Sequence, residues 1–231
     1  MKNVSDEKRN TCEGKLTVNE CYNILSTFKN NKTPGNDGLT IEFYKAFWLL
    51  LGNQLVDALN YSYEHGQLST SQRQAVITLL EKKDKDKRFI KNWRPISLIN
   101  VETKIGSKAL CKRLEKVLPD IIHYNQNAFV QGRSIFDAIR TIDDIMEYTK
   151  IMKLSGFLIT IDFEKAFDSV NHSFLIKTLE AFNFGPSFIR WACGLNCNLM
   201  SCIMNNGFST EPTFLFHEAC VRATHFHHTF F

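Results

Sequence analysis

The sequence predicts an α+β fold in which helices dominate. Long stretches carry apolar residues at the three- and four-residue spacing of an amphipathic helix. Between them lie short apolar segments rich in β-branched residues, which favour strands. Hydrophobic residues make up 44% of the 231 residues, so the chain has enough apolar material to form a sizeable core.

The N-terminal part alternates between helical and turn-forming patterns. Residues 1–15 are polar and are expected to be disordered. Helical spacing then runs from Thr17, a candidate N-cap, to Asn30. The stretch N-K-T-P-G-N-D-G at residues 31–38 predicts a loop. A second helical stretch follows over residues 40–65, and Gly66 suits its C-terminal end.

The remaining elements continue this mixture. The charged segment 81–91 predicts a hairpin loop between the strand Ala75–Leu80 and an extended segment at 92–98, which contains Pro95. Pro119 is expected to end the helix that precedes it. The other helices are expected at 101–118, 135–152, 173–182 and 187–193, and the other strands at 157–161 and 200–204, the first of them buried.

Positive charge is concentrated in one segment of the chain. Between Lys82 and Arg113 there are eleven basic and three acidic residues, although the net charge of the whole chain is only +4. A basic stripe on a nearly neutral protein indicates a polyanionic partner. A solvent-exposed charged face without a partner is the alternative interpretation.

The cysteines and the distribution of apolar residues limit the class of protein that the sequence can encode. The seven cysteines are odd in number and scattered, so no disulfide framework is expected. The N-terminus lacks the apolar core of a signal peptide, and no run of about 18 apolar residues predicts a membrane span. We therefore expect an intracellular, reducing environment.

One apolar stretch ends in a carboxylate, in I-T-I-D-F-E-K-A-F-D-S-V at residues 159–170. A strand that ends in an exposed Asp162 can hold Mg²⁺, which takes carboxylate oxygens and fills its other positions with water and phosphates. Phe167 would then lie under a nucleotide sugar, and Arg94 would neutralise a triphosphate. The structural alternatives are a turn or cap role for Asp162, a core position for Phe167 and a salt bridge for Arg94.

Five segments in order resemble the reverse transcriptase domain of non-LTR (LINE-type) retrotransposons. They span roughly residues 17–210 and comprise N-K-T-P-G-N-D-G-L-T-I-E-F-Y-K, V-I-T-L-L-E-K-K-D-K-D-K with N-W-R-P-I-S-L, Q-N-A-F-V-Q-G-R-S-I, I-T-I-D-F-E-K-A-F-D-S-V, and I-M-N-N-G-F-S-T. The resemblance implies the fingers (16–155) and part of the palm (156–212) of a right-hand polymerase, followed by an unrelated tail at 213–231.

The resemblance also implies residue roles. Asp162 would be the first metal-binding aspartate, the Phe163 carbonyl would hold the same ion, and Phe167 would be the steric gate. Arg94, with Lys82 or Lys83, would contact the incoming triphosphate, and the segment Gln131, Gly132 and Arg133 would lie near the template. The intact family member would use Mg²⁺, an RNA template, a DNA primer and dNTPs, in the nucleus or in a cytoplasmic ribonucleoprotein.

The sequence departs from the family after Thr210. The family continues with R-Q-G-x-P-L-S-P and then two adjacent aspartates, whereas the acidic residues here after Asp168 are Glu180, Glu211 and Glu218. One permitted coding of residues 217–231, read in a shifted frame, gives R-S-V-R-Q-G-D-P-L-S-P-Y-F-F. We therefore expect a frameshift near residues 211–215 and a truncated product.

A single carboxylate cannot organise the two metal ions of a polymerase, so we expect this chain alone to be inactive. The alternatives are a nucleic-acid-binding fragment without chemistry, a genomic relic without a selected function, and a zinc protein. The ligands considered for zinc lack a recognised spacing; they are Cys193, Cys197, Cys202, Cys220, His225, His227 and His228.

Overall fold

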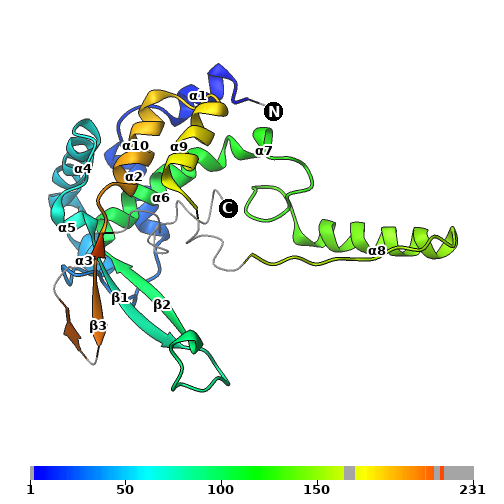
Figure 1. Cartoon of the computed structure of the whole chain (residues 1–231). Helices are drawn as coiled ribbons and strands as arrows, with labels where there is room; N and C mark the ends of the chain where they lie inside the picture. Colours follow the sequence, from blue (N-terminus) through cyan, green and yellow to red (C-terminus); the bar gives the residue numbers. More distant parts are fainter. Residues whose placement is uncertain (1–2, 164–169, 206, 211–213, 216–231) are drawn as a thin grey trace.

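A helical body carries two projections that point in different directions (Figure 1). The computed structural model describes residues 3–163, 170–205, 207–210 and 214–215. One projection is the hairpin of β1 (Gln74–Glu81) and β2 (Trp93–Ile99), and the other is α8 (Ile135–Ile151) with the chain that follows it. The expected fold, α+β with helices dominant, is confirmed.

The body is built from short and medium helices. The Thr17 hydroxyl accepts a hydrogen bond from the Glu20 amide, which confirms the predicted N-cap. Two of the predicted helical stretches are each divided into two helices. The stretch at 40–65 is divided at Phe47, and the stretch at 101–118 is divided after Lys116. The helices are α1 (Asp6–Cys12), α2 (Val18–Thr27), α3 (Ile41–Ala46), α4 (Trp48–Glu64), α5 (Thr70–Arg73), α6 (Val101–Glu115), α7 (Leu118–Ile121), α9 (His172–Ala181) and α10 (Pro186–Asn196).

The sheet joins the middle of the chain to its C-terminal part. Its order is β2-β1-β3-β4, with β5 also paired to β3; the later strands are β3 (Met200–Asn205), β4 (Phe208–Ser209) and β5 (Phe214–Leu215). The β1–β2 pair is antiparallel, with Leu79 opposite Pro95, whereas β1 and β3 are parallel. Pro95 is tolerated because β2 lies at the edge of the sheet.

One apolar core unites helices from both ends of the sequence. Ile105 and Leu110 on α6 and Phe188 on α10 are fully buried in it. α6 contacts α1, α2 and α10, and α10 also contacts α4 and α9. The predicted fingers and palm segments therefore share this core.

The N-terminus differs from the expected disordered segment. Residues 6–12 form α1, Val4 and Cys12 are buried, and the Val4 amide donates to the Phe182 carbonyl at 2.9 Å. The Glu13 carboxylate accepts from the backbone amides of Ser187 and Phe188 and so caps α10. Sequence reading missed this segment because its partners lie far along the chain, on α6 about 100 positions away and on α10 about 175 positions away.

The predicted buried strand at 157–161 is wrong. No strand is found among the described residues 152–163, and Phe157 and Ile161 are 99% and 78% exposed. Among the described residues, no strand lies beside this segment to pair with its backbone. A lone extended segment has no cross-strand hydrogen bonds, so its apolar pattern is not enough to fix it as a strand.

α8 forms over the predicted residues but packs differently from the other long helices. None of its residues is buried, and it extends away from the body (Figure 1). Its exposed apolar side chains are Ile135, Phe136, Ile139, Ile142, Ile145, Met146, Tyr148 and Ile151. In the part of the chain that the structure describes, no helix is long and apolar enough to cross a membrane.

Candidate nucleotide and nucleic-acid site

The β1–β2 hairpin presents the predicted nucleotide-binding cations. Arg94 is exposed on β2, opposite Leu80 of β1, one residue pair from the loop that closes the hairpin. Lys83 is exposed in the loop, whereas the Lys82 ammonium donates to the Lys91 carbonyl at 2.8 Å. The structure therefore brings Arg94 and the two lysines to the same end of one hairpin.

Internal hydrogen bonds hold the hairpin loop. The Asp86 carboxylate accepts from Arg88, and this pairing lowers the pKa of the Asp86 carboxyl. The Asn92 amide donates to the Asp86 carbonyl at 2.7 Å, and the Trp93 indole donates to the Lys87 carbonyl at 2.8 Å. The loop thus has a defined shape while its lysines remain near solvent.

The turn-forming loop at residues 31–38 docks at the base of the hairpin. Asn100 lies between β2 and α6, is fully buried, and donates to the Ser71 carbonyl at 3.1 Å. Its side-chain oxygen accepts from the Asp37 amide, and a Cβ on Gly35 would meet that oxygen at 2.1 Å. Glycine is therefore required at this close approach, which fixes the loop against the end of β2.

Several partly buried ionisable groups lie near the contact between Asn100 and the loop at 31–38, and the sequence did not indicate them. Burial raises the pKa of Glu102, with a further contribution from Asp37. Burial lowers the pKa of Lys104 and raises that of Tyr44. Their only sequence signal was charge next to a strand–helix junction, which does not distinguish a buried group from a solvated one.

The predicted template segment shows a structural role for one of its residues. The Arg133 guanidinium donates to the carbonyls of Gln126 at 2.7 Å, Ile122 at 2.8 Å and Pro119 at 3.2 Å, and also to that of His123. It therefore holds the connection between α7 and α8. Gln131 is exposed, and Gly132 has a φ of +80°, which glycine adopts without strain.

Within the described residues, the predicted metal-binding position Asp162 is not assembled with other carboxylates. Asp162 and Phe163 lie in the exposed segment after α8, and Phe167 lies outside the described residues. Among the described residues, no group of three or more His, Cys, Asp or Glu side chains could hold a metal ion. Asp162 is a single carboxylate in this segment, so the described residues do not form a complete magnesium site.

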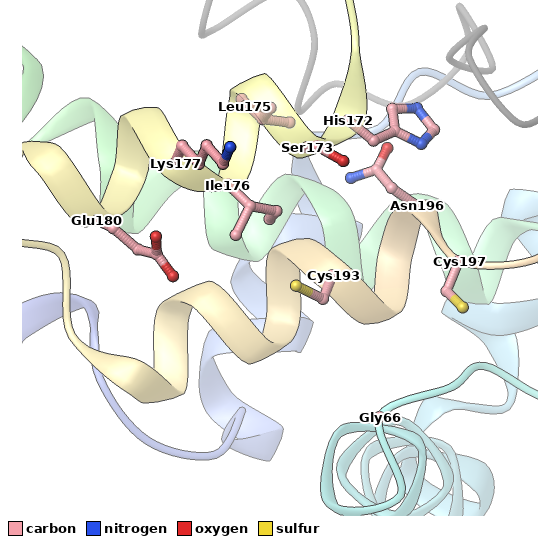
Figure 2. Close-up of a pocket in the computed structure, with 10 residues that line it drawn as sticks. All are labelled: Gly66, His172, Ser173, Leu175, Ile176, Lys177, Glu180, Cys193, Asn196 and Cys197. Carbon is pink, nitrogen blue, oxygen red and sulfur yellow. The ribbon is translucent and has the colours of Figure 1, made fainter.

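A separate hollow of about 470 Å³ lies between α9 and α10 (Figure 2). His172, Cys193 and Glu180 contribute to its lining, and burial lowers the pKa of the His172 imidazole. None of the predicted nucleotide, template or magnesium residues that the structure describes lines this hollow, whereas Cys193 and Cys197 of the zinc alternative do. The six described cysteines are free thiols, and Cys220 with the three tail histidines of the zinc alternative lies outside the described residues.

A basic two-stranded hairpin on a helical body, followed by a segment that carries an aspartate, is consistent with an α+β fragment of a nucleic-acid polymerase. The chain belongs to the reverse transcriptase (RNA-dependent DNA polymerase) family, whose model matches residues 80–216. That family implies a divalent metal ion, a template and a primer for the intact enzyme.

Similar proteins come from non-LTR retrotransposons, as the motifs predicted. The chain is 43% identical over 209 residues to the transposon TX1 uncharacterized 149 kDa protein of Xenopus laevis, covering 90% of this chain and 16% of that protein. It is 28% identical over 165 residues to the putative 115 kDa protein in type-1 retrotransposable element R1DM of Drosophila melanogaster, covering 71% of this chain and 16% of that protein. The chain thus spans about one sixth of the length of these curated relatives.

Proposed function

We propose that this chain is the fingers part of an RNA-directed DNA polymerase from a non-LTR retrotransposon, with part of its palm. An RNA template, a DNA primer and dNTPs are its ligands. The observation that carries this proposal is the exposure of Lys83 and Arg94 at the end of a hairpin inside the family match. Arginine and lysine at such a position suit phosphate groups, arginine by paired hydrogen bonds and lysine as a point charge.

The roles assigned to the other site residues follow from their positions. Arg94, with Lys82 or Lys83, contacts the triphosphate. Gln131 and Gly132 lie on the exposed side of the connection before α8, near the template, while Arg133 shapes that connection. Asp162 and the Phe163 carbonyl would bind Mg²⁺ beside carboxylates from elsewhere, and Phe167 is the steric gate.

The chain alone is expected to be inactive as a polymerase. One exposed aspartate, in a segment without strand partners among the described residues, does not organise two metal ions. The family match ends at residue 216, next to the position where the shifted reading frame begins, which supports the proposed frameshift. The nucleotide sequence of the gene tests this point: a shifted frame that does not encode R-Q-G-D-P-L-S-P refutes it.

The proposed function is tested with the full chain and a fluorescent RNA–DNA primer-template. We expect binding that weakens steeply with salt, because neutralised phosphates release counterions. We expect Lys83→Gln/Arg94→Gln to weaken it about tenfold at low salt, and Lys150→Gln/Lys153→Gln, the same charge change on the exposed end of α8, to leave it nearly unchanged.

Two outcomes would overturn parts of this proposal. Equal effects of the two double variants would remove the hairpin from the binding site. Extension of the primer by the unaltered chain with Mg²⁺ and dNTPs would refute the expected inactivity. If binding is retained by Asp162→Ala and no extension occurs, the chain acts as a nucleic-acid-binding fragment.

A further inference from the structure

The basic segment between Lys82 and Arg113 is divided between two surfaces. One is the hairpin described above. The other is a row of lysines on α6, in which Lys108, Lys112 and, just after the helix, Lys116 follow one another at four-residue intervals. Four residues of α-helix rise about 6 Å, so this row places cations at regular intervals along one helix face.

A second row of side chains lies opposite these lysines. It consists of Asn19, Asn23 and Thr27, again at four-residue spacing, on the exposed side of α2. Lys108 donates to the Thr27 hydroxyl at 3.1 Å, and Arg113 pairs with Glu20 at 2.7 Å. These two contacts show that the helices run antiparallel, so Asn23 faces Lys112 and Asn19 faces Lys116.

A groove of about 620 Å³ separates the two rows. Asn19, Asn23 and Thr27 line it from α2, and Lys112 and Lys116 line it from α6. Lys108 stands at its end, where its ammonium lies 4.9 Å from the centre of the Phe28 ring. The groove therefore combines amide hydrogen-bonding groups on one wall with ammonium groups on the other.

The acidic groups that line the groove already have structural partners. The Glu20 carboxylate accepts two hydrogen bonds from Arg113, and the Glu13 carboxylate caps α10. Lys112 also contacts Glu115, but this pair is solvent-exposed, and such pairs are weak enough for a phosphate to replace the carboxylate. The net effect is a cationic groove.

We propose that the α2–α6 groove binds the phosphodiester backbone of single-stranded RNA. A repeated row of cations suits a polyanion with regularly spaced charges better than a single phosphate. The asparagine amides opposite can donate to and accept from bases and 2′-hydroxyls. This inference rests on the proposed function, because it assumes a nucleic-acid-binding chain, but it concerns a different surface from the hairpin.

The test measures binding of a fluorescein-labelled single-stranded RNA of about 20 nucleotides to the full chain by anisotropy. We expect Lys112→Gln/Lys116→Gln to weaken binding about tenfold at low salt and to reduce the salt slope by between one and two, as loss of two phosphate contacts requires. Asn23→Asp keeps every lysine but places a carboxylate opposite Lys112, and it should weaken binding in the same direction.

The matched control is Lys150→Gln/Lys153→Gln, which removes two exposed lysines from the other projection. Circular dichroism checks that every variant is folded. Absence of RNA binding by the unaltered chain, or equal effects of the groove and control variants, overturns the inference. If Lys83→Gln/Arg94→Gln weakens binding and the groove variants do not, the proposed function stands and the groove inference fails. Tighter binding of a duplex than of the single strand also overturns it.

Discussion

α6 and α8 are helices of similar length with opposite surroundings. α6 has 15 residues, of which ten are buried, whereas α8 has 17 residues and none is buried. Both carry apolar residues at helical spacing, and both were predicted from that spacing. The comparison shows that amphipathic periodicity predicts a helix but does not show whether a partner covers its apolar side.

The difference also indicates which part of the chain contributes most to the free energy of unfolding. The body buries apolar side chains of helices from both ends of the chain in one core, so changes there should alter the free energy of unfolding. The α8 projection buries none of its own side chains, so equivalent changes there should have little effect on the folding of the body.

The largest contrast is expected between Phe188→Ala and Ile145→Ala. Phe188 is fully buried on α10, and its truncation should lower the free energy of unfolding by about 3–5 kcal/mol. Ile145 is 57% exposed on α8, so its truncation should change that free energy by less than about 0.5 kcal/mol. Urea unfolding followed by circular dichroism measures both. Similar losses would show that α8 is covered by the body.

Arg113→Ala tests the buried polar contacts beside this core. The Arg113 side chain is 9% exposed, pairs with Glu20 and donates to the carbonyls of residues 12–15. We expect the free energy of unfolding to fall by about 2–4 kcal/mol. This is slightly less than for a fully buried pair, because Glu20 keeps some contact with water. The exposed pair of Arg88 and Asp86 is the control, and Arg88→Ala should not measurably change the unfolding midpoint.

Arg133→Ala probes the junction between the two regions. It removes hydrogen bonds to four backbone carbonyls at 119–126, so we expect faster amide hydrogen exchange in that connection. Arg133→Lys should not restore protection, because an ammonium cannot replace the fork of guanidinium donors. Unchanged exchange in both variants would show that other contacts hold the connection.

The smallest expected effect concerns Glu102. Burial raises its pKa, so its contribution to stability is present below the ordinary value of 4.5 and is lost as the pH rises through the folded value. Glu102→Gln stays neutral, and we expect it to be slightly more stable than the native chain at pH 7. The gain in stability should disappear below pH 4.5. Thermal unfolding of both proteins at pH 7 and below pH 4.5 measures it. A gain that is constant with pH would refute this explanation.

Local patterns predicted most of the elements. The N-cap at Thr17, the hairpin around its charged loop and the helix at 135–151 needed only neighbouring residues, and all three were predicted correctly. The strand at 157–161 and the disordered N-terminus were not, because each depends on partners distant in sequence. The presence or absence of such a partner leaves no periodic signal in the segment itself.

The candidate site was predictable only in part. Arg94, Lys82 and Lys83 were identified from charge and from the family motifs, and the hairpin brings them together. Asn100 was missed because a buried asparagine between a strand and a helix resembles an ordinary cap. The α2–α6 groove was missed because the two facing rows come from helices more than 70 positions apart.

The contacts of Glu13 and Gly14 have a consequence for synthesis on the ribosome. Glu13 caps α10 through the amides of Ser187 and Phe188, and the Gly14 carbonyl accepts from the Trp191 indole at 3.2 Å. Both residues are translated long before α10, whereas their carbonyl contacts with Arg113 on α6 can form earlier. The contacts with α10 form only after residue 191 has emerged, so a ribosome stalled earlier would leave the body incomplete on this side and open to chaperones and proteases.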